Sequence, residues 1–202
     1  SEGFRYYPGT TKRAVIELSW VNAFGPWGDV GQIVSRNWEK VGVKTSLVER
    51  QRALHFQMRD ANELQSEMWQ EDSGAFPFSV TTKYDPRNIG SGVGLTLAPL
   101  VGKWYSTSGK EGVAPSADLK KVVDLLDKAK VSGEADRVTI AKELYGVWVD
   151  NMFEIGIVGL TPMVQGVVVV NNNLLNVPKL AGNDWPPRSP GNARPEVWFY
   201  KK

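Results

Sequence analysis

The segment most informative about the fold is Leu64-Gln65-Ser66-Glu67-Met68-Trp69-Gln70-Glu71-Asp72. In it Leu64, Ser66 and Met68 alternate with Gln65, Glu67 and Trp69, and two carboxylates follow. The period of two residues from Leu64 to Gln70 predicts a β-strand whose two faces differ. A loop containing glycine and proline comes next, so the strand ends beside Trp69, Glu71 and Asp72. Ligands of open α/β sheets bind beyond the carboxyl ends of the strands. This strand end therefore predicts a ligand site with a stacking ring and negative charge, although the same residues could cover the core or be solvated.

The preceding residues predict a parallel strand-helix-strand unit, which favours the ligand-binding interpretation. Its parts are a strand over Ala14–Trp20, a helix that Asp29 caps and Gly42 ends, and a strand over Val43–Glu49. Trp20 and Asn22 should then emerge at the same rim as Trp69. A helix over Arg50–Asn62 carries His55, which we interpret as a surface or core-edge residue outside the site.

Composition narrows the class of protein. The 202 residues fit one domain, and 42% apolar residues with a formal charge of +2 describe a globular chain rather than a nucleic-acid binder. No cysteine and a single histidine argue against thiolate or multi-histidine metal sites and against most nucleophilic triads. We therefore expect no metal and no cofactor.

The second half of the sequence predicts two long helices and then irregular chain. The helices run from Ser116 to about Gly133 and from Glu134 to Met152, and we expect the second to turn Val138, Ala141, Tyr145, Trp148, Val149 and Met152 inward. Two β-rich runs follow, at 155–160 and 164–170. From Asn171 onward the chain is rich in proline, and only Val197–Tyr200 predicts a strand. So long an irregular segment indicates a tail that lies against another surface.

Together these elements resemble a known family. The resemblance rests on the Ala14–Ser19 strand, the segment Trp38-Glu39-Lys40-Val41-Gly42-Val43-Lys44, the Met68–Asp72 strand end, Asp85-Pro86, the paired helices and the closing Pro195–Tyr200. The chain looks like the carboxyl-terminal lobe of the extracellular solute-binding proteins of ABC importers, in the oligopeptide, dipeptide and nickel class (family 5). The resemblance implies an α/β lobe of the periplasmic-binding-protein type II kind, with a mixed sheet flanked by helices and an extended proline-rich C-terminal tail.

The resemblance also implies a binding role without chemistry. In peptide-binding members, the aspartate at this strand end pairs with the ammonium of the ligand and the nearby tryptophan lines a pocket, roles that fall on Asp72 and Trp69. We add Trp20, Asn22 and Asp85 to the expected ligand-binding set. The loop between Asp72 and Asp85 is longer than in peptide binders, and oligosaccharide binders of the class also have tryptophan-rich clefts. The expected solute is therefore a peptide or an oligosaccharide.

The expected organisation and partners follow from the two-lobed family fold. Residues 1–178 would form the lobe, and residues 179–202 would return to an N-terminal lobe that is absent from this chain. Because the chain starts at Ser1, we expect a processed protein or a piece of a longer one, without its signal segment. Further expectations are an ABC permease as partner, a place outside the cytoplasmic membrane and tethered to its outer face, and a tail that could swap between two copies.

Two other functions remain open at this point. The first is a glycoside hydrolase that uses Glu71, Asp72 or Asp85 as its carboxylate pair. The second is a structural interaction domain. It is distinguished from a binding protein by whether Trp20, Trp69 and Trp104 converge on a concave surface or scatter through the core.

Overall fold

The computed structural model describes residues 3–23, 25–70, 77–78, 83–88, 97–157, 170–179 and 193–201. The chain forms two compact units: Ser1–Glu71 with Asp85–Val123, and Asp72–Tyr84 with Asp124–Lys202. Helices and small sheets, one parallel and one antiparallel, confirm the expected mixed α/β class. Most of the proline-rich tail, residues 180–192, lies outside the described residues.

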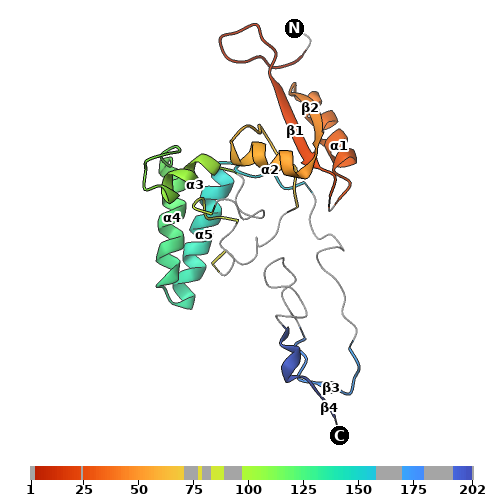
Figure 1. The fold of residues 1–202 in the computed structure, drawn as a ribbon, viewed down its shortest axis with the longest axis vertical. Helices are drawn as coiled ribbons and strands as arrows, with labels where there is room; N and C mark the ends of the chain where they lie inside the picture. Colours follow the sequence, from red (N-terminus) through yellow and green to blue (C-terminus); the bar gives the residue numbers. More distant parts are fainter. Residues whose placement is uncertain are drawn as a thin grey trace. The chain divides into compact units, whose positions relative to one another are not determined.

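The predicted strand-helix-strand unit is confirmed. Strand β1 (Val15–Val21), helix α1 (Trp27–Lys40) and strand β2 (Lys44–Arg50) follow one another, and Figure 1 shows the two strands side by side with α1 beside them. The strands are parallel, and their register runs from Val15 opposite Lys44 to Val21 opposite Arg50. Both strands therefore end at the same edge of the sheet, as the sequence predicts.

The two ends of α1 have different causes. The predicted cap at Asp29 is wrong: the capping position is three residues earlier, at Pro26, and Asp29 lies in the first turn of the helix. There the carboxylate favours the helix through its dipole. At the other end the prediction holds, because Gly42 takes a φ of +82°. Its N–H donates to the Glu39 carbonyl at 3.0 Å and that of Val43 to Trp38 at 2.9 Å, a Schellman ending.

The strand predicted over residues 64–70 is wrong in extent. Only one parallel bridge, Ser19 to Glu67, joins this segment to the free edge of β1. The N–H of Met68 donates to the Ser19 carbonyl at 2.8 Å. Side chains replace the other ladder bonds: the Ser66 hydroxyl donates to the Glu17 carbonyl at 2.5 Å, and the Gln65 amide oxygen accepts from the Glu17 N–H at 2.8 Å. Polar side chains that bond to backbone compete with a regular ladder in this way.

One apolar cluster joins these elements. Leu18 and Trp20 lie on the same face of β1 and are buried with Met68. Three partly buried side chains, Trp27, Val34 and Trp38, pack against them. Residues 64–70 thus take part in the core through Met68, even without forming a strand.

Two shorter helices complete this unit before α4. Helix α2 (Arg52–Asp60) begins after Gln51, whose side-chain oxygen accepts from the N–H groups of Ala53 and Leu54. It is shorter than predicted, and His55, expected at the surface or core edge, is fully buried. Helix α3 (Pro99–Ser106) starts with proline, which is favoured at a first helical position.

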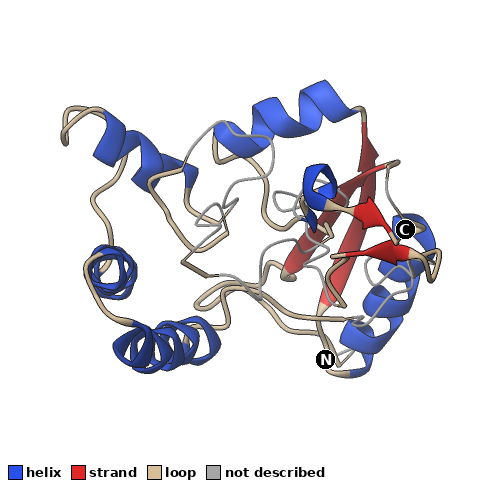
Figure 2. Cartoon of the chain, turned by 90° about the horizontal axis from the view of Figure 1, so that it is seen from below, coloured by secondary structure: helices blue, strands red, loops and turns tan. Residues whose placement is uncertain are grey.

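The two long helices form as predicted. Helix α4 (Ala117–Lys130) is capped by Ser116, whose hydroxyl accepts from the Leu119 N–H at 3.3 Å. Helix α5 is Glu134–Asp150. Figures 1 and 2 show α5 beside the last turns of α4, where the Arg137 guanidinium donates to the Ala129 carbonyl at 2.9 Å.

The inward face predicted for α5 is wrong in part, because Trp148 is buried and Ala141 and Tyr145 are half-buried as expected, but the other three residues are not. The buried residues are Ile140, Leu144, Val147 and Trp148, whereas Val138, Val149 and Met152 are exposed. Apolar side chains lie on two sides of this helix, so periodicity alone does not select the buried side. Two residues of the predicted face do pack inward: the rings of Tyr145 and Trp148 meet the Tyr84 ring edge-on, with centroids 5.8 and 4.9 Å apart. Burial also raises the pKa of the Tyr145 phenol, which the Lys83 ammonium partly offsets.

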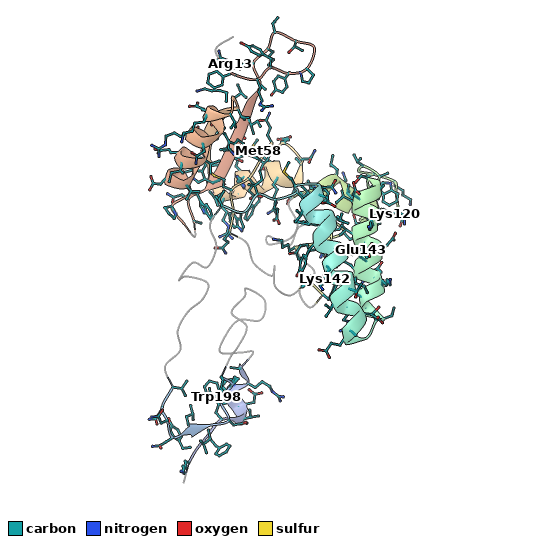
Figure 3. The ribbon with its side chains drawn as sticks, turned by 180° about the vertical axis from the view of Figure 1, so that it is seen from behind. Arg13, Met58, Lys120, Lys142, Glu143 and Trp198 are labelled. Carbon is teal, nitrogen blue, oxygen red and sulfur yellow. The ribbon has the colours of Figure 1, made fainter. Side chains whose placement is uncertain are left out.

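The end of the chain contains little regular structure among its described residues. Residues 155–157 form no strand, and the rest of the two β-rich runs, except Val170, lies outside the described residues. The strand predicted over Val197–Tyr200 shrinks to β4 (Phe199–Tyr200), which pairs antiparallel with β3 (Leu174–Leu175) after a short 3₁₀ helix, η2 (Pro195–Val197). Trp198, labelled in Figure 3, donates its indole N–H to the Ala193 carbonyl at 3.0 Å.

We expect Gly42→Ala to lower the free energy of unfolding by about 1–3 kcal/mol. An added Cβ would lie 2.5 Å from the Gly3 carbonyl oxygen, at a residue whose φ is +82°. Gly146→Ala, inside α5 with no atom within 4 Å of the added Cβ, should instead raise stability by about 0.5–1 kcal/mol. Urea unfolding followed by circular dichroism measures both. An unchanged midpoint for Gly42→Ala would contradict the backbone clash.

The corrected face of α5 predicts a contrast between two apolar truncations. Leu144 is fully buried, so Leu144→Ala should cost about 2–5 kcal/mol. Val149 is largely exposed, so Val149→Ala should change stability by less than about 0.5 kcal/mol. Urea titrations of the two variants test this. Equal losses would mean that the sequence-predicted face is buried after all.

Candidate functional site

An open hollow of about 390 Å³ lies where β1 and β2 end. It is lined by Val21, Asn22, Ala23, Glu49, Arg50, Gln51 and Arg52. The first three residues come from the end of β1, and the others from the end of β2 and the start of α2. This is the edge at which parallel sheets bind ligands. Of the residues that the sequence predicts for a site, Asn22 lines this hollow.

Local structure holds the polar side chains of this hollow in place. Arg50, the last residue of β2, has its two terminal nitrogens 2.9 Å from the two carboxylate oxygens of Glu17 on β1. This ion pair, with one hydrogen bond from Nη2, offsets the Arg50 charge and links the end of β2 to Glu17, the third residue of β1. Gln51 is occupied as the cap of α2, whereas Asn22 is exposed just beyond β1. The hollow thus offers amide and charged groups on a fixed frame.

Trp69 is connected to this hollow through one face of α2. Its half-buried indole meets the Phe56 ring edge-on, with centroids 5.8 Å apart. The Arg52 guanidinium lies over the same Phe56 ring at 5.2 Å and that of Arg59 at 4.5 Å. Because Arg52 also lines the hollow, a chain of direct contacts leads from the hollow to Trp69. The structure therefore brings Asn22 and Trp69 into one region of the molecule.

Trp20 and Asp85 have structural partners. The Trp20 side chain is in the core with Leu18 and Met68, and the residue is only 7% exposed. Asp85 is 6% exposed, and its two carboxylate oxygens accept from Arg87 Nε and Nη2, both at 2.8 Å. Their ligand-binding roles stay predictions. Glu71 and Asp72 lie outside the described residues.

The glycoside hydrolase interpretation gains no support from these placements. An acid or nucleophile must reach the sugar, whereas the Asp85 carboxylate is engaged within its own loop by Arg87.

Within the described ranges, no three His, Asp or Glu side chains gather as metal ligands. No helix in those ranges is long and apolar enough to cross a bilayer.

The three tryptophans proposed as a test of a structural role do not share one surface. Trp20 is in the core, Trp69 lies on Phe56, and Trp104 on α3 meets Tyr105 edge-on at 5.0 Å. A tryptophan-lined cleft of all three is therefore not formed within this unit.

Sequence reasoning missed a buried polar pair behind Trp69. His55 Nε2 lies 2.7 Å from Glu67 Oε1, and both side chains are buried. The alternation gave no signal for it, because Glu67 lies on the side of the segment opposite to Met68, the core residue. Arg52 was missed as well, although its position just after β2 places it at the ligand-binding edge.

Comparisons with known proteins place the fold. No family model matches the chain, and no curated protein matches it. Among solved structures, the chain is similar to an oligopeptide-binding protein, OppA, with a TM-score of 0.70 and 22% identity. The match covers 99% of this chain and 32% of OppA, so the chain spans about a third of that protein. The fold of this chain is therefore similar to that of about a third of this oligopeptide-binding protein.

Proposed function

We propose that this chain is the C-terminal lobe of a family 5 solute-binding protein that captures peptides for an ABC importer. The observation that carries the proposal is the likeness to OppA over 99% of the chain. The hollow at the carboxyl edge of β1 and β2 supports it, because solutes of such folds bind beyond strand ends. Capture would proceed by closure of two lobes around the solute, without a chemical step.

Trp69, Asp72 and Asn22 form the core of the proposed site. Asp72 would pair with the ammonium of the ligand, as the resemblance implies, and Trp69 would pack against a side chain. Asn22 would offer its amide from the rim of the hollow. Trp20 and Asp85, which are buried, would support these residues from behind, Trp20 by packing under the end of β1 and Asp85 by shaping its loop.

A peptide suits this site better than an oligosaccharide. Sugars bind through exposed aromatic faces, and Trp20 uses its ring in the core. The described lining instead offers amide and charged groups, which match the termini and backbone of a peptide. The printed name of OppA, an oligopeptide-binding protein, favours the same solute.

The proposed partners follow from the two-lobed organisation. Residues 1–178 would form the lobe, and residues 179–202 would return to an N-terminal lobe in the same protein. Leu175, Val197, Phe199 and Tyr200 are exposed, which supports a tail that covers another surface. The whole protein would act outside the cytoplasmic membrane, tethered to its outer face, and deliver solute to a permease. Without the other lobe, tails could exchange between copies.

We expect the 202-residue chain alone to bind peptide very weakly. A charge-assisted bond contributes about 1.5–3 kcal/mol and an aromatic contact about 1 kcal/mol, whereas micromolar binding needs about 8 kcal/mol. The other lobe must supply the difference. Isothermal titration with a mixed tripeptide library measures this, and a micromolar dissociation constant for the isolated chain would contradict the single-lobe account.

In the full-length protein that carries this lobe, Asp72→Asn should weaken binding of peptides with a free amino terminus about 10- to 150-fold. This is the loss expected when a bond of about 1.5–3 kcal/mol to a charged group is removed. Binding of the same peptides after N-acetylation should be weak in both proteins. Asp29→Asn, an exposed change on α1, is the matched control and should leave affinity unchanged. An Asp72→Asn protein with full affinity for free peptides would exclude the ammonium role.

A further inference from the structure

The pair of His55 and Glu67 is buried behind the proposed solute site. His55 is the single histidine of the chain and is fully buried. The Glu67 side chain is 8% exposed, and its Oε1 lies 2.7 Å from His55 Nε2. Among the described residues, neither the second ring nitrogen nor the second carboxylate oxygen has a hydrogen-bond partner. Within the described part of the chain, the side chains of His55 and Glu67 are therefore hydrogen-bonded to each other.

This pair connects α2 to the segment beside β1. Glu67 forms the bridge to Ser19, and its neighbours Ser66 and Met68 are bonded to the backbone of β1. On the opposite side, His55 belongs to the buried face of α2. The hydrogen bond thus fixes the distance between the helix and residues 65–68, because hydrogen bonds require a narrow range of length and direction.

A second contact from α2 lies next to the first. Phe56 follows His55 in the helix, and its ring meets the indole of Trp69 at 5.8 Å. Trp69 is two residues beyond Glu67. Consecutive residues of α2 therefore hold this segment at two points, His55 at Glu67 and Phe56 at Trp69. Two points of attachment set both the position and the orientation of the indole.

An apolar pair could fill the same space but would not impose the same geometry. Replacing a buried charged pair by apolar side chains is often neutral or favourable for stability, whereas removing one partner leaves the other unsatisfied. A buried His-Glu pair at this position is therefore better explained by a role in placing the neighbouring segment than by its contribution to stability alone.

We propose that His55 and Glu67 are positioning residues that set the orientation of Trp69 in the solute site. The inference rests on the proposed function as far as affinity is concerned. The position of the indole in the ligand-free protein is independent of that function.

Three variants of the full-length protein distinguish a loss of protein stability from a change in the position of Trp69. His55→Gln keeps a side-chain N–H near the place of Nε2 and should retain the bond to Glu67. His55→Leu removes that donor and leaves Glu67 buried without a partner. The double variant His55→Leu with Glu67→Met removes both polar groups. Stability is measured by urea unfolding, affinity by titration with peptide, and the indole by the Trp69 N–H signal in NMR spectra, assigned with Trp69→Phe.

His55→Gln should keep the Trp69 signal and an affinity within about twofold of the parent. His55→Leu should lose stability and affinity together. The double variant should recover stability, yet its Trp69 signal should shift and its affinity should fall about five- to tenfold, the loss of about one aromatic contact. A double variant with the parent signal and parent affinity would overturn the proposal.

A matched control removes a different polar contact between a helix and a strand. Ser35 on α1 and Thr45 on β2 have their hydroxyls 2.5 Å apart, and Ser35→Ala with Thr45→Val removes this contact. It should leave the Trp69 signal and the affinity unchanged, and a shift as large as that of the double variant would overturn a specific role for His55. A parent protein that binds no peptide refutes the proposed function, whereas an unshifted Trp69 signal in the double variant refutes the positioning role.

Discussion

The attachment of residues 65–68 to β1 is the interaction on which the rest of this unit depends. A single backbone bridge at Glu67 would be weak, but the side chains of Ser66 and Gln65 bond to the backbone of Glu17. These bonds hold the segment parallel to β1 without a full strand. They thereby place Met68 in the core and direct Trp69 toward α2.

From this attachment the two sides of β1 take different roles. Leu18 and Trp20 face α1 and form the core with Met68, so that side is apolar. Ser19 is fully buried and uses its hydroxyl to donate to the Ser66 carbonyl at 2.6 Å. On the polar side, Ser19 is bridged to Glu67, which is hydrogen-bonded to His55. The hollow lies at the end of the strand. The alternation of one strand thus separates an apolar side from a polar side.

Much of the fold could be predicted because its causes are local. The apolar periods of α1 and α4, the glycine at the end of α1 and the serine before α4 act within a few residues. The predictions failed where a distant partner decides. The extent of the segment at 64–70 depends on the backbone of Glu17, which bonds to the Ser66 and Gln65 side chains. For Asp85 the sequence predicts a ligand-binding carboxylate, and only the structure shows that Arg87 pairs with it; its role in binding stays a prediction.

The sequence by itself determined the parallel pair of strands, the long helices and the edge at which a solute site would lie. Only the tertiary structure decided which tryptophan serves the core. Trp20 and Trp69 each stand near the end of a segment for which the sequence predicts a strand. Trp20 is enclosed with Leu18 and Met68, and Trp69 rests on Phe56 of α2. Burial is a property of the neighbours that folding assembles, and these neighbours come from distant parts of the chain.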